Sequence, residues 1–351
     1  MPLRSRSCAR VPALLVLALL AAGSLVGCSG GGGAGPGSGS AGPSGAAPLV
    51  AAPEPARAPV PSVPPAGRVL PLGGGRPEGM VADPRSGLVA VALREPDRLA
   101  LLDPRRGRVV RTFPVPGSAR HLELAPGGGA VLVPGEDTDL VTRVELPSGR
   151  AGAPVKVGRQ PHDTAVTSDG TQYVADEFGG SVSVLRDGRV VKTFRGLLQP
   201  GGAAGNGDTG AVVDVRSRFT SFYRDGEQVA RLLSGAGPTH ALALGGAGVL
   251  VTDTTGGVLY RFSTTGTPRE LERVPLPGRP YGTAYDARRH RAWVTATERN
   301  LLVEYDVTAT GLRQVATFPT VRDAYSVAVD EASGRVVVAS EIDSTLQVIQ
   351  P

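Results

Sequence analysis

Three of the four histidines in this chain fall at matching places in a repeated pattern. His121, His162 and His240 each lie one or two residues after a recurring proline or alanine. Imidazole binds divalent metals and titrates near neutral pH, so converging histidines could hold an ion or supply a general base. The fourth, His290, lies in the turn-like stretch ARRHR, and we expect it in solvent.

The pattern that places these histidines recurs seven times. Its anchor positions are Pro77, Ala119, Pro161, Pro200, Pro238, Pro280 and Ala324, which are 42, 42, 39, 38, 42 and 44 residues apart. A period near forty residues is typical of β-propeller blades. With 49 glycines and 31 prolines in 351 residues, the composition also favours an all-β protein with many turns.

The clearest unit runs from Gly158 to Gly196 and contains four short apolar runs, each closed by a turn-forming pair. Such a unit predicts four antiparallel strands. The sequence therefore predicts a seven-bladed β-propeller over residues 67–351, whose least regular unit is 197–235. The last unit has only three strands, and Arg68–Leu72 is predicted to supply the fourth, which closes the ring and removes an open edge.

The residues just after each anchor should begin the inner strands and face the central channel. From these positions we predict a ligand-binding mouth formed by Glu78, Arg120, His121, His162, Asp163, His240, Tyr281 and Tyr325. The guanidinium of Arg120 would repel a cation and suits an anionic ligand. A second reading makes His121, His162, His240 and Asp163 ligands of a divalent metal, with His162 or His240 as a catalytic base. In a third interpretation, these side chains only fill a narrow polar channel and bind no ligand.

Acidic residues recur near the end of each second strand, at Glu95, Glu136, Asp176, Glu177, Asp253, Glu298 and Glu341. Carboxylates at such turns accept backbone N–H bonds and end strands, and this is the interpretation we favour. The alternative is a carboxylate-lined rim that binds a cation or a basic partner. No nucleophile elbow or phosphate loop accompanies either set, so the sequence holds no complete catalytic constellation.

Residues 1–27 have the arginines and the apolar stretch of a secretion signal, which ends in Leu25-Val26-Gly27-Cys28. This ending resembles the lipobox of bacterial lipoproteins, and that resemblance implies a lipid anchor on Cys28. Residues 28–66 are rich in Gly, Ser, Ala and Pro and are predicted to be a disordered linker. The signal carries three of the positive charges and no acid, so the formal net charge falls from +5 to +2 without it. So weak a charge argues against nucleic-acid binding.

The stretch GRQPHDTAVTSDGTQYVADEFGGSVSV resembles the YVTN-type (YncE-like) seven-bladed propeller family, with weaker versions such as VDEASGRVVVASEIDSTLQVI elsewhere. The resemblance covers roughly residues 67–351. It implies a binding scaffold of the cell envelope, and related propellers are lactonases or lyases.

Together these features predict a monomeric, lipid-anchored propeller at the outer face of the cytoplasmic membrane of an actinobacterium-like cell. We expect a non-catalytic module without a cofactor that binds a small ligand or an envelope protein. The alternative function is a metal-assisted lyase or lactonase.

Overall fold

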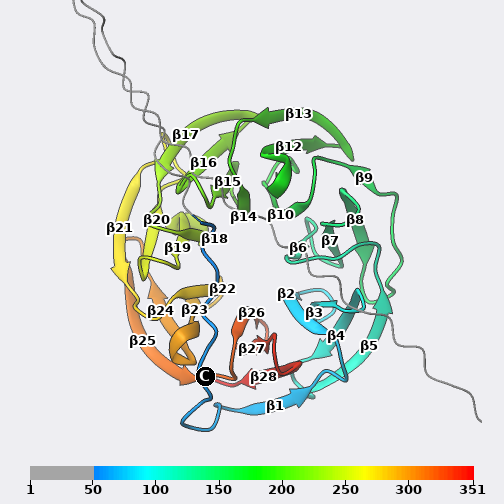
Figure 1. Ribbon diagram of the computed structural model, residues 1–351, viewed down its shortest axis with the longest axis vertical. Coiled ribbons are helices and arrows are strands. Elements are labelled where there is room, and N and C mark those ends of the chain that lie inside the picture. Colours follow the sequence, from blue (N-terminus) through cyan, green and yellow to red (C-terminus); the bar gives the residue numbers. More distant parts are fainter. Residues whose placement is uncertain (1–50) are drawn as a thin grey trace, which may run out of the picture. The chain divides into compact units, whose positions relative to one another are not determined.

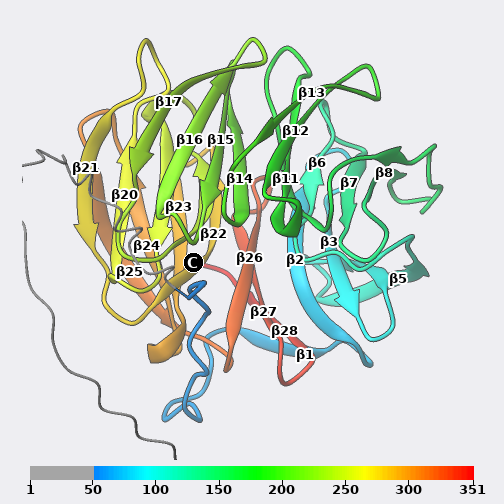
Figure 2. The same cartoon turned by 45° about the horizontal axis from the view of Figure 1, so that its top comes forward.

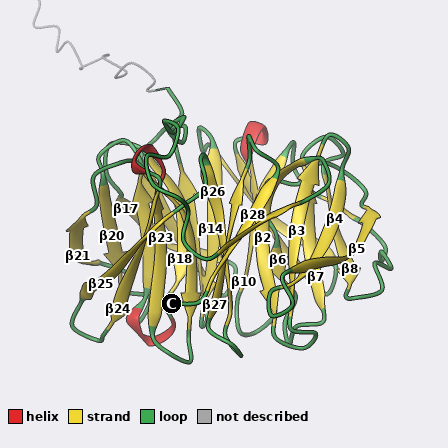
Figure 3. Ribbon diagram, turned by 90° about the horizontal axis from the view of Figure 1, so that it is seen from below, coloured by secondary structure: helices red, strands yellow, loops and turns green. Residues whose placement is uncertain are grey.

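The computed structural model describes residues 51–351, which form seven four-stranded antiparallel sheets around a central channel (Figure 1). The predicted seven-bladed propeller is thus confirmed. The strands run along the channel axis when the ring is seen edge-on (Figure 3). The predicted signal and Cys28 lie outside the described residues. Within residues 51–351, no helix has the length and apolarity needed to cross a bilayer.

Blades 1 to 4, each from inner to outer strand, are β2 (Arg76–Asp83), β3 (Leu88–Arg94), β4 (Arg98–Asp103), β5 (Arg108–Pro114); β6 (Glu123–Leu124), β7 (Ala130–Gly135), β8 (Leu140–Glu145), β9 (Val155–Lys156); β10 (Pro161–Val166), β11 (Gln172–Asp176), β12 (Ser181–Arg186), β13 (Arg189–Arg195); and β14 (Pro200–Asn206), β15 (Thr209–Asp214), β16 (Phe219–Arg224), β17 (Glu227–Leu233). Blades 5 to 7 are β18 (Pro238–Ala243), β19 (Val249–Asp253), β20 (Val258–Phe262), β21 (Glu270–Pro275); β22 (Pro280–Asp286), β23 (Arg291–Ala296), β24 (Leu301–Val307), β25 (Leu312–Pro319); and β26 (Ala324–Asp330), β27 (Arg335–Ser340), β28 (Thr345–Ile349), β1 (Arg68–Pro71).

Packing between neighbouring blades forms the hydrophobic core. The second strand of each blade reads as an almost continuous apolar run, as in Leu88–Arg94, because neighbouring blades cover both of its faces. The outermost strands are largely exposed, as in Arg108–Pro114. Seven apolar clusters fill the seven interfaces, including the one between the first and last blades.

The ring closes as the sequence predicted. Strand β1 pairs antiparallel with β28, from Arg68 opposite Val348 to Pro71 opposite Thr345. The two ends of the propeller thus share one sheet, and β1 appears beside β28 in Figure 2. The buried side chain of Gln347 accepts a hydrogen bond from the Val321 amide and donates to the carbonyl of Ala66, just before β1.

Blade 4 corresponds to the unit 197–235, the least regular one in the sequence. Its glycine-rich start, Pro200–Asn206, is the inner strand β14. The glycines allow neighbouring backbones to approach closely. A Cβ on Gly202 would lie 2.4 Å from the Thr239 carbonyl oxygen of blade 5, and one on Gly205 would meet the Val166 carbonyl of blade 3.

The segment before β1 also contacts the propeller. Figure 1 shows residues 51–67, in blue, passing β18 and β22 on the way to β1. The Ala58 amide donates a hydrogen bond to Asp323 at 2.6 Å, and Asn300 donates one to the Pro59 carbonyl at 2.9 Å. The linker predicted to end at residue 66 therefore has a final part that is bound to the blades rather than free of them.

Candidate functional site

Irregular pairing directs the predicted channel residues into the channel. In six blades the ladder between the first two strands shifts register just after the anchor, for example between Pro77 and Met80 and between Pro280 and Thr283. Such bulges leave residues unpaired and change the direction of their side chains. In blade 2 the inner strand is reduced to Glu123–Leu124, and Arg120 and His121 precede it.

Six of the eight predicted residues line one cavity of about 390 Å³ at the end of the channel where the inner strands begin. We call it the mouth cavity. The six are Glu78, Arg120, His121, His240, Tyr281 and Tyr325. His162 adjoins it and lines a small pocket that also includes Arg120 and Tyr281. Asp163 lies deeper in the channel.

Five aromatic rings form a continuous row across the channel. The ring of His121 lies 4.9 Å from those of both His162 and His240, and that of His240 lies 4.2 Å from Tyr281. The ring centroids of Tyr281 and Tyr325 are 5.7 Å apart. Histidines of blades 2 and 5, which are not neighbours in the ring, therefore meet because the channel is narrow.

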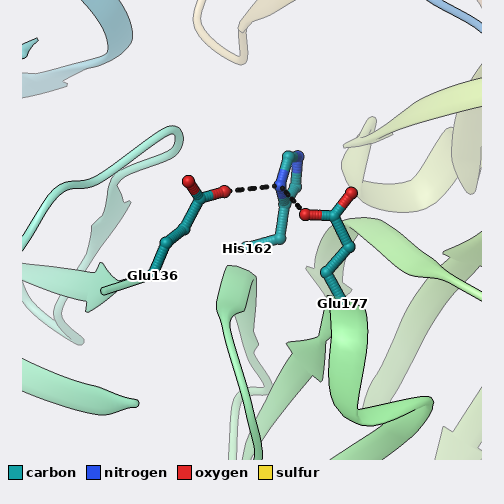
Figure 4. A group of neighbouring side chains, drawn as sticks. All are labelled: Glu136, His162 and Glu177. Carbon is teal, nitrogen blue, oxygen red and sulfur yellow. Dashed lines mark hydrogen bonds and ion pairs between the residues drawn. The ribbon is translucent and has the colours of Figure 1, made fainter. Parts of the chain in front are cut away.

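His162 lies between two carboxylates (Figure 4). Its Nδ1 is 3.1 Å from Oε1 of Glu136 and 3.2 Å from Oε2 of Glu177. Burial alone would lower the pKa of His162, but the hydrogen bonds and charges of the two glutamates outweigh it and raise the pKa to about 10. At neutral pH this imidazole is therefore an imidazolium that donates to the carboxylates.

The other two channel histidines are neutral. Burial, together with the positive charge of His162, lowers the pKa of His121 well below 6.5 and that of His240 to about 3. One residue type thus has two charge states within a few ångströms. Only the histidine held by two carboxylates keeps its proton.

Arginines and glutamates surround this row of rings. Arg94 pairs with Glu136 at 3.3 Å and lies 3.8 Å from Glu78. Nε of Arg120 lies 3.4 Å from Glu136 but forms no hydrogen bond, and Nδ1 of His240 also has none within the described part of the chain. Both atoms are buried away from the cavity surface, whereas the Arg120 side chain as a whole is 40% exposed and can be reached by a ligand in the mouth cavity.

Asp163 is bound to the backbone and does not reach the mouth cavity. Its two carboxylate oxygens accept hydrogen bonds from the amides of Thr164 and Ala203, both at 2.8 Å. The bond from Ala203 joins blade 3 to blade 4. Burial raises the pKa of Asp163 to about 7.

The segment before β1 contributes to the mouth cavity. Glu54 and Arg57 line it, the hydroxyl of Tyr325 donates to the Ala56 carbonyl at 3.1 Å, and Arg279 donates to the Glu54 carbonyl at 2.9 Å. From the sequence, this segment is predicted to belong to the disordered linker 28–66. No residue periodicity marks it, because it belongs to no blade.

The acidic residues near the ends of the second strands separate into two kinds. Asp176 and Asp253 accept backbone N–H bonds in turns, as the favoured interpretation expected. Glu136 and Glu177 instead contact His162, and Glu341 lines the mouth cavity. Because the second strand is antiparallel to the first, its end returns to the face where the inner strand begins. The recurrence of acidic residues at this position is visible in the sequence. The same position places Arg94, at the end of β3, beside the mouth cavity.

The structure favours a different metal-ligand set from the sequence. Among residues 51–351, only Glu136, His162 and Glu177 place three ligand atoms within 4.8 Å of one another. His162 is the one residue that this set shares with the group His121, His162, His240 and Asp163.

No protein-family model matches this sequence, and no curated protein matches it. Solved structures share its fold. Streptogramin B lyase is 12% identical with a TM-score of 0.68 over 81% of this chain and 97% of that one. A catalytically inactive histidine-to-alanine variant of virginiamycin B lyase from Staphylococcus aureus, with quinupristin, is 14% identical with a TM-score of 0.64 over 80% and 98%. A chain of the mitotic checkpoint complex is 13% identical with a TM-score of 0.69 over 86% and 97%. Enzymes and assembly proteins thus share this architecture, and identities this low show the fold alone.

The pKa of His162 predicts how stability depends on pH. Folding raises this pKa from 6.5 to about 10, so its contribution is fully present below pH 6.5 and is lost as the pH rises toward 10. Without metal, the free energy of unfolding should fall between pH 7 and 9 by up to about 1.4 kcal/mol per pH unit through this group. His162→Gln should flatten this fall, whereas the exposed control His290→Gln should not. Equal slopes in chemical denaturation of wild type and His162→Gln would contradict the assignment.

Proposed function

We propose that this chain is a non-catalytic binding module of the cell envelope that takes a small polar ligand, or the end of an envelope protein, in its mouth cavity. The observation that carries the proposal is a cavity of about 390 Å³ at which the partly exposed guanidinium of Arg120 meets the rings of His240 and Tyr281. A cavity of this size with a few convergent polar groups is typical of small-molecule sites. The resemblance to the YVTN-type family supports the same class of function.

The lining of the cavity indicates the charge of the ligand. Arginines and glutamates occur in equal number, at Arg57, Arg76, Arg94, Arg120 and at Glu54, Glu78, Glu95, Glu341. Burial raises the pKa of Glu78, which weakens one of the negative charges. Arg76 pairs with Glu341 and Glu95, and Nε of Arg120 pairs with Glu136, but the Arg120 side chain remains 40% exposed and can meet a ligand. The site therefore fits a ligand with an anionic group for Arg120 and hydrogen-bonding groups for the rim.

Three probes of similar size test the charge preference. N-acetylglycine carries a carboxylate, glycylglycine is a zwitterion, and glycinamide is a cation without a carboxylate. We expect the first two to bind in calorimetric titrations and glycinamide not to bind, because guanidinium groups pair with carboxylates. Arg120→Gln should weaken binding by about tenfold or more.

The matched control is Arg98→Gln, since Arg98 is exposed and lies outside the cavity. Loss of binding in the control, or unchanged binding in Arg120→Gln, would count against the mouth cavity as the ligand site. If none of the three probes binds, the proposed ligand class is wrong.

We propose further that Cys28 is lipidated and holds the domain at the outer face of the membrane. The support is the stretch Leu25-Val26-Gly27-Cys28 after an apolar segment with an arginine-rich start. When expressed in a bacterium that processes lipoproteins, the chain should enter the detergent phase in phase-separation assays. Cys28→Ser should move it to the aqueous phase. Partition of the wild-type chain into the aqueous phase would refute the anchor.

A metal-assisted lyase or lactonase is the second candidate, and the set Glu136, His162 and Glu177 favours it. One imidazole and two carboxylates form a donor set that suits zinc and similar ions. A divalent metal held there would act as a Lewis acid on a ligand in the mouth cavity. The lyases with the same fold are consistent with this candidate.

Protonation argues for binding over catalysis in the metal-free chain. His162 already carries its proton, so it cannot accept another as a general base. His240 is neutral, but a pKa of about 3 makes it a weak base.

Metal analysis separates the two functions. The enzyme candidate requires about one divalent ion per chain after dialysis against zinc or manganese. Glu177→Gln should lose this ion. The control Glu298→Gln should keep it, because Glu298 lies outside the three-ligand set. The non-catalytic binding module requires no bound metal ion. Elemental analysis of residues 51–351 decides between them, and a metal-free wild-type chain rules out the enzyme candidate.

A further inference from the structure

A second cavity, of about 400 Å³, lies where the inner strands end. We call it the far cavity. The inner strands of six blades line it, from β2, β6, β14, β18, β22 and β26. Most of its lining is apolar, with side chains such as Met80, Leu124, Leu242 and Val327. Such a lining differs in character from the arginines and glutamates of the mouth cavity.

The two cavities are separate ends of one channel. Along β2, Glu78 lines the mouth cavity and Ala82 lines the far cavity. Along β22, Tyr281 lines the mouth cavity and Tyr285 lines the far cavity. Four residues of strand span about 13 Å at 3.3 Å per residue. A ligand in the far cavity therefore need not touch the residues of the mouth.

Most acidic groups of the far cavity are already engaged. Asp83 accepts the Gly129 amide at 2.7 Å, and Asp330 accepts the Ala332 amide at 3.2 Å. Glu331 accepts the Ala287 amide at 3.1 Å and lies 3.8 Å from Arg288. These carboxylates stabilise turns and do not need a ligand.

Glu123 is the exception. Its carboxyl lines the far cavity and the middle of the channel, and it has neither a hydrogen bond nor an ion pair with any other described residue. The charged group that acts on it is a second acid, Asp163. Burial and this like charge raise the pKa of Glu123 to about 8. An acid without a partner in an apolar cavity is costly, and a cation beside it removes that cost.

We propose that the far cavity is a second binding site, for a small amphiphilic amine whose ammonium group pairs with Glu123 while its apolar body lies against the alanine, valine and leucine lining. The apolar surface supplies affinity, and the carboxyl selects the head group. A carboxylate head would meet both Glu123 and Asp163 and would be repelled. The proposal is independent of the function proposed for the mouth cavity.

Three compounds with one chain length test the proposal: octylamine, octanol and octanoate at pH 8.5, where the alkylammonium and most of Glu123 are charged. Met80 lines the far cavity, and Met1 is the only other methionine, so a ¹³C-labelled methionine methyl group reports binding directly. We expect octylamine to shift the Met80 methyl signal with the highest affinity, octanol with at least about tenfold lower affinity, and octanoate not at all.

Variants assign the selectivity to one carboxyl. Glu123→Gln should weaken octylamine binding about tenfold and leave octanol binding unchanged. The control Glu270→Gln, which removes an exposed carboxyl that pairs with Arg273 outside the far cavity, should leave both unchanged. Equal affinities for octylamine and octanol, or no shift of Met80 with any compound, would overturn the proposal. The comparison of three compounds in the wild-type chain decides the question even if Glu123→Gln fails to fold.

Discussion

The pairing of β1 with β28 is the interaction on which the rest of the structure depends. It joins the first strand of the propeller to its last blade, so that β28 is paired on both sides and the interface between the first and last blades is buried. Gln347 strengthens this closure by binding the chain on both sides of the junction, at Ala66 and Val321. The same closure brings the segment before β1 to the mouth cavity, where Glu54 and Arg57 join residues from blades far along the chain.

The closed ring is narrow, and this narrowness controls the electrostatics of the channel. Glycines at the starts of several inner strands let neighbouring backbones approach; a Cβ on Gly79 would lie 2.6 Å from the Cα of His121. Side chains that face the channel are thereby brought together and removed from water. Burial lowers the pKa of His240, whereas the two carboxylates beside His162 outweigh burial and raise its pKa, so that His162 is charged while His240 is neutral. The channel also differs along its length, with a mixed-charge mouth and an apolar far cavity.

Much of this arrangement follows from a visible repeat. The anchor spacing predicted seven blades, the closing strand and the six residues that line the mouth cavity, because equivalent positions in a propeller face the same channel. Other features depend on contacts between distant residues. The glycine-rich start of blade 4 is irregular in sequence because the backbones that approach its glycines belong to blades 3 and 5. Asp163 looked like a ligand-binding residue, but the amide of Ala203 in the next blade accounts for one of its oxygens.

The sequence by itself determined the architecture and which residues face the channel, since both depend on local alternation and on a period that survives in the residue order. Only the tertiary structure decided which of those residues meet and in which charge state. Three features arise from the closure and width of the ring: the distance between His121 and His240, the two carboxylates around His162, and the lack of a partner for Glu123 among residues 51–351. These are properties of residues far apart in the chain, and the free energy of a buried charge depends on such neighbours rather than on the residue itself.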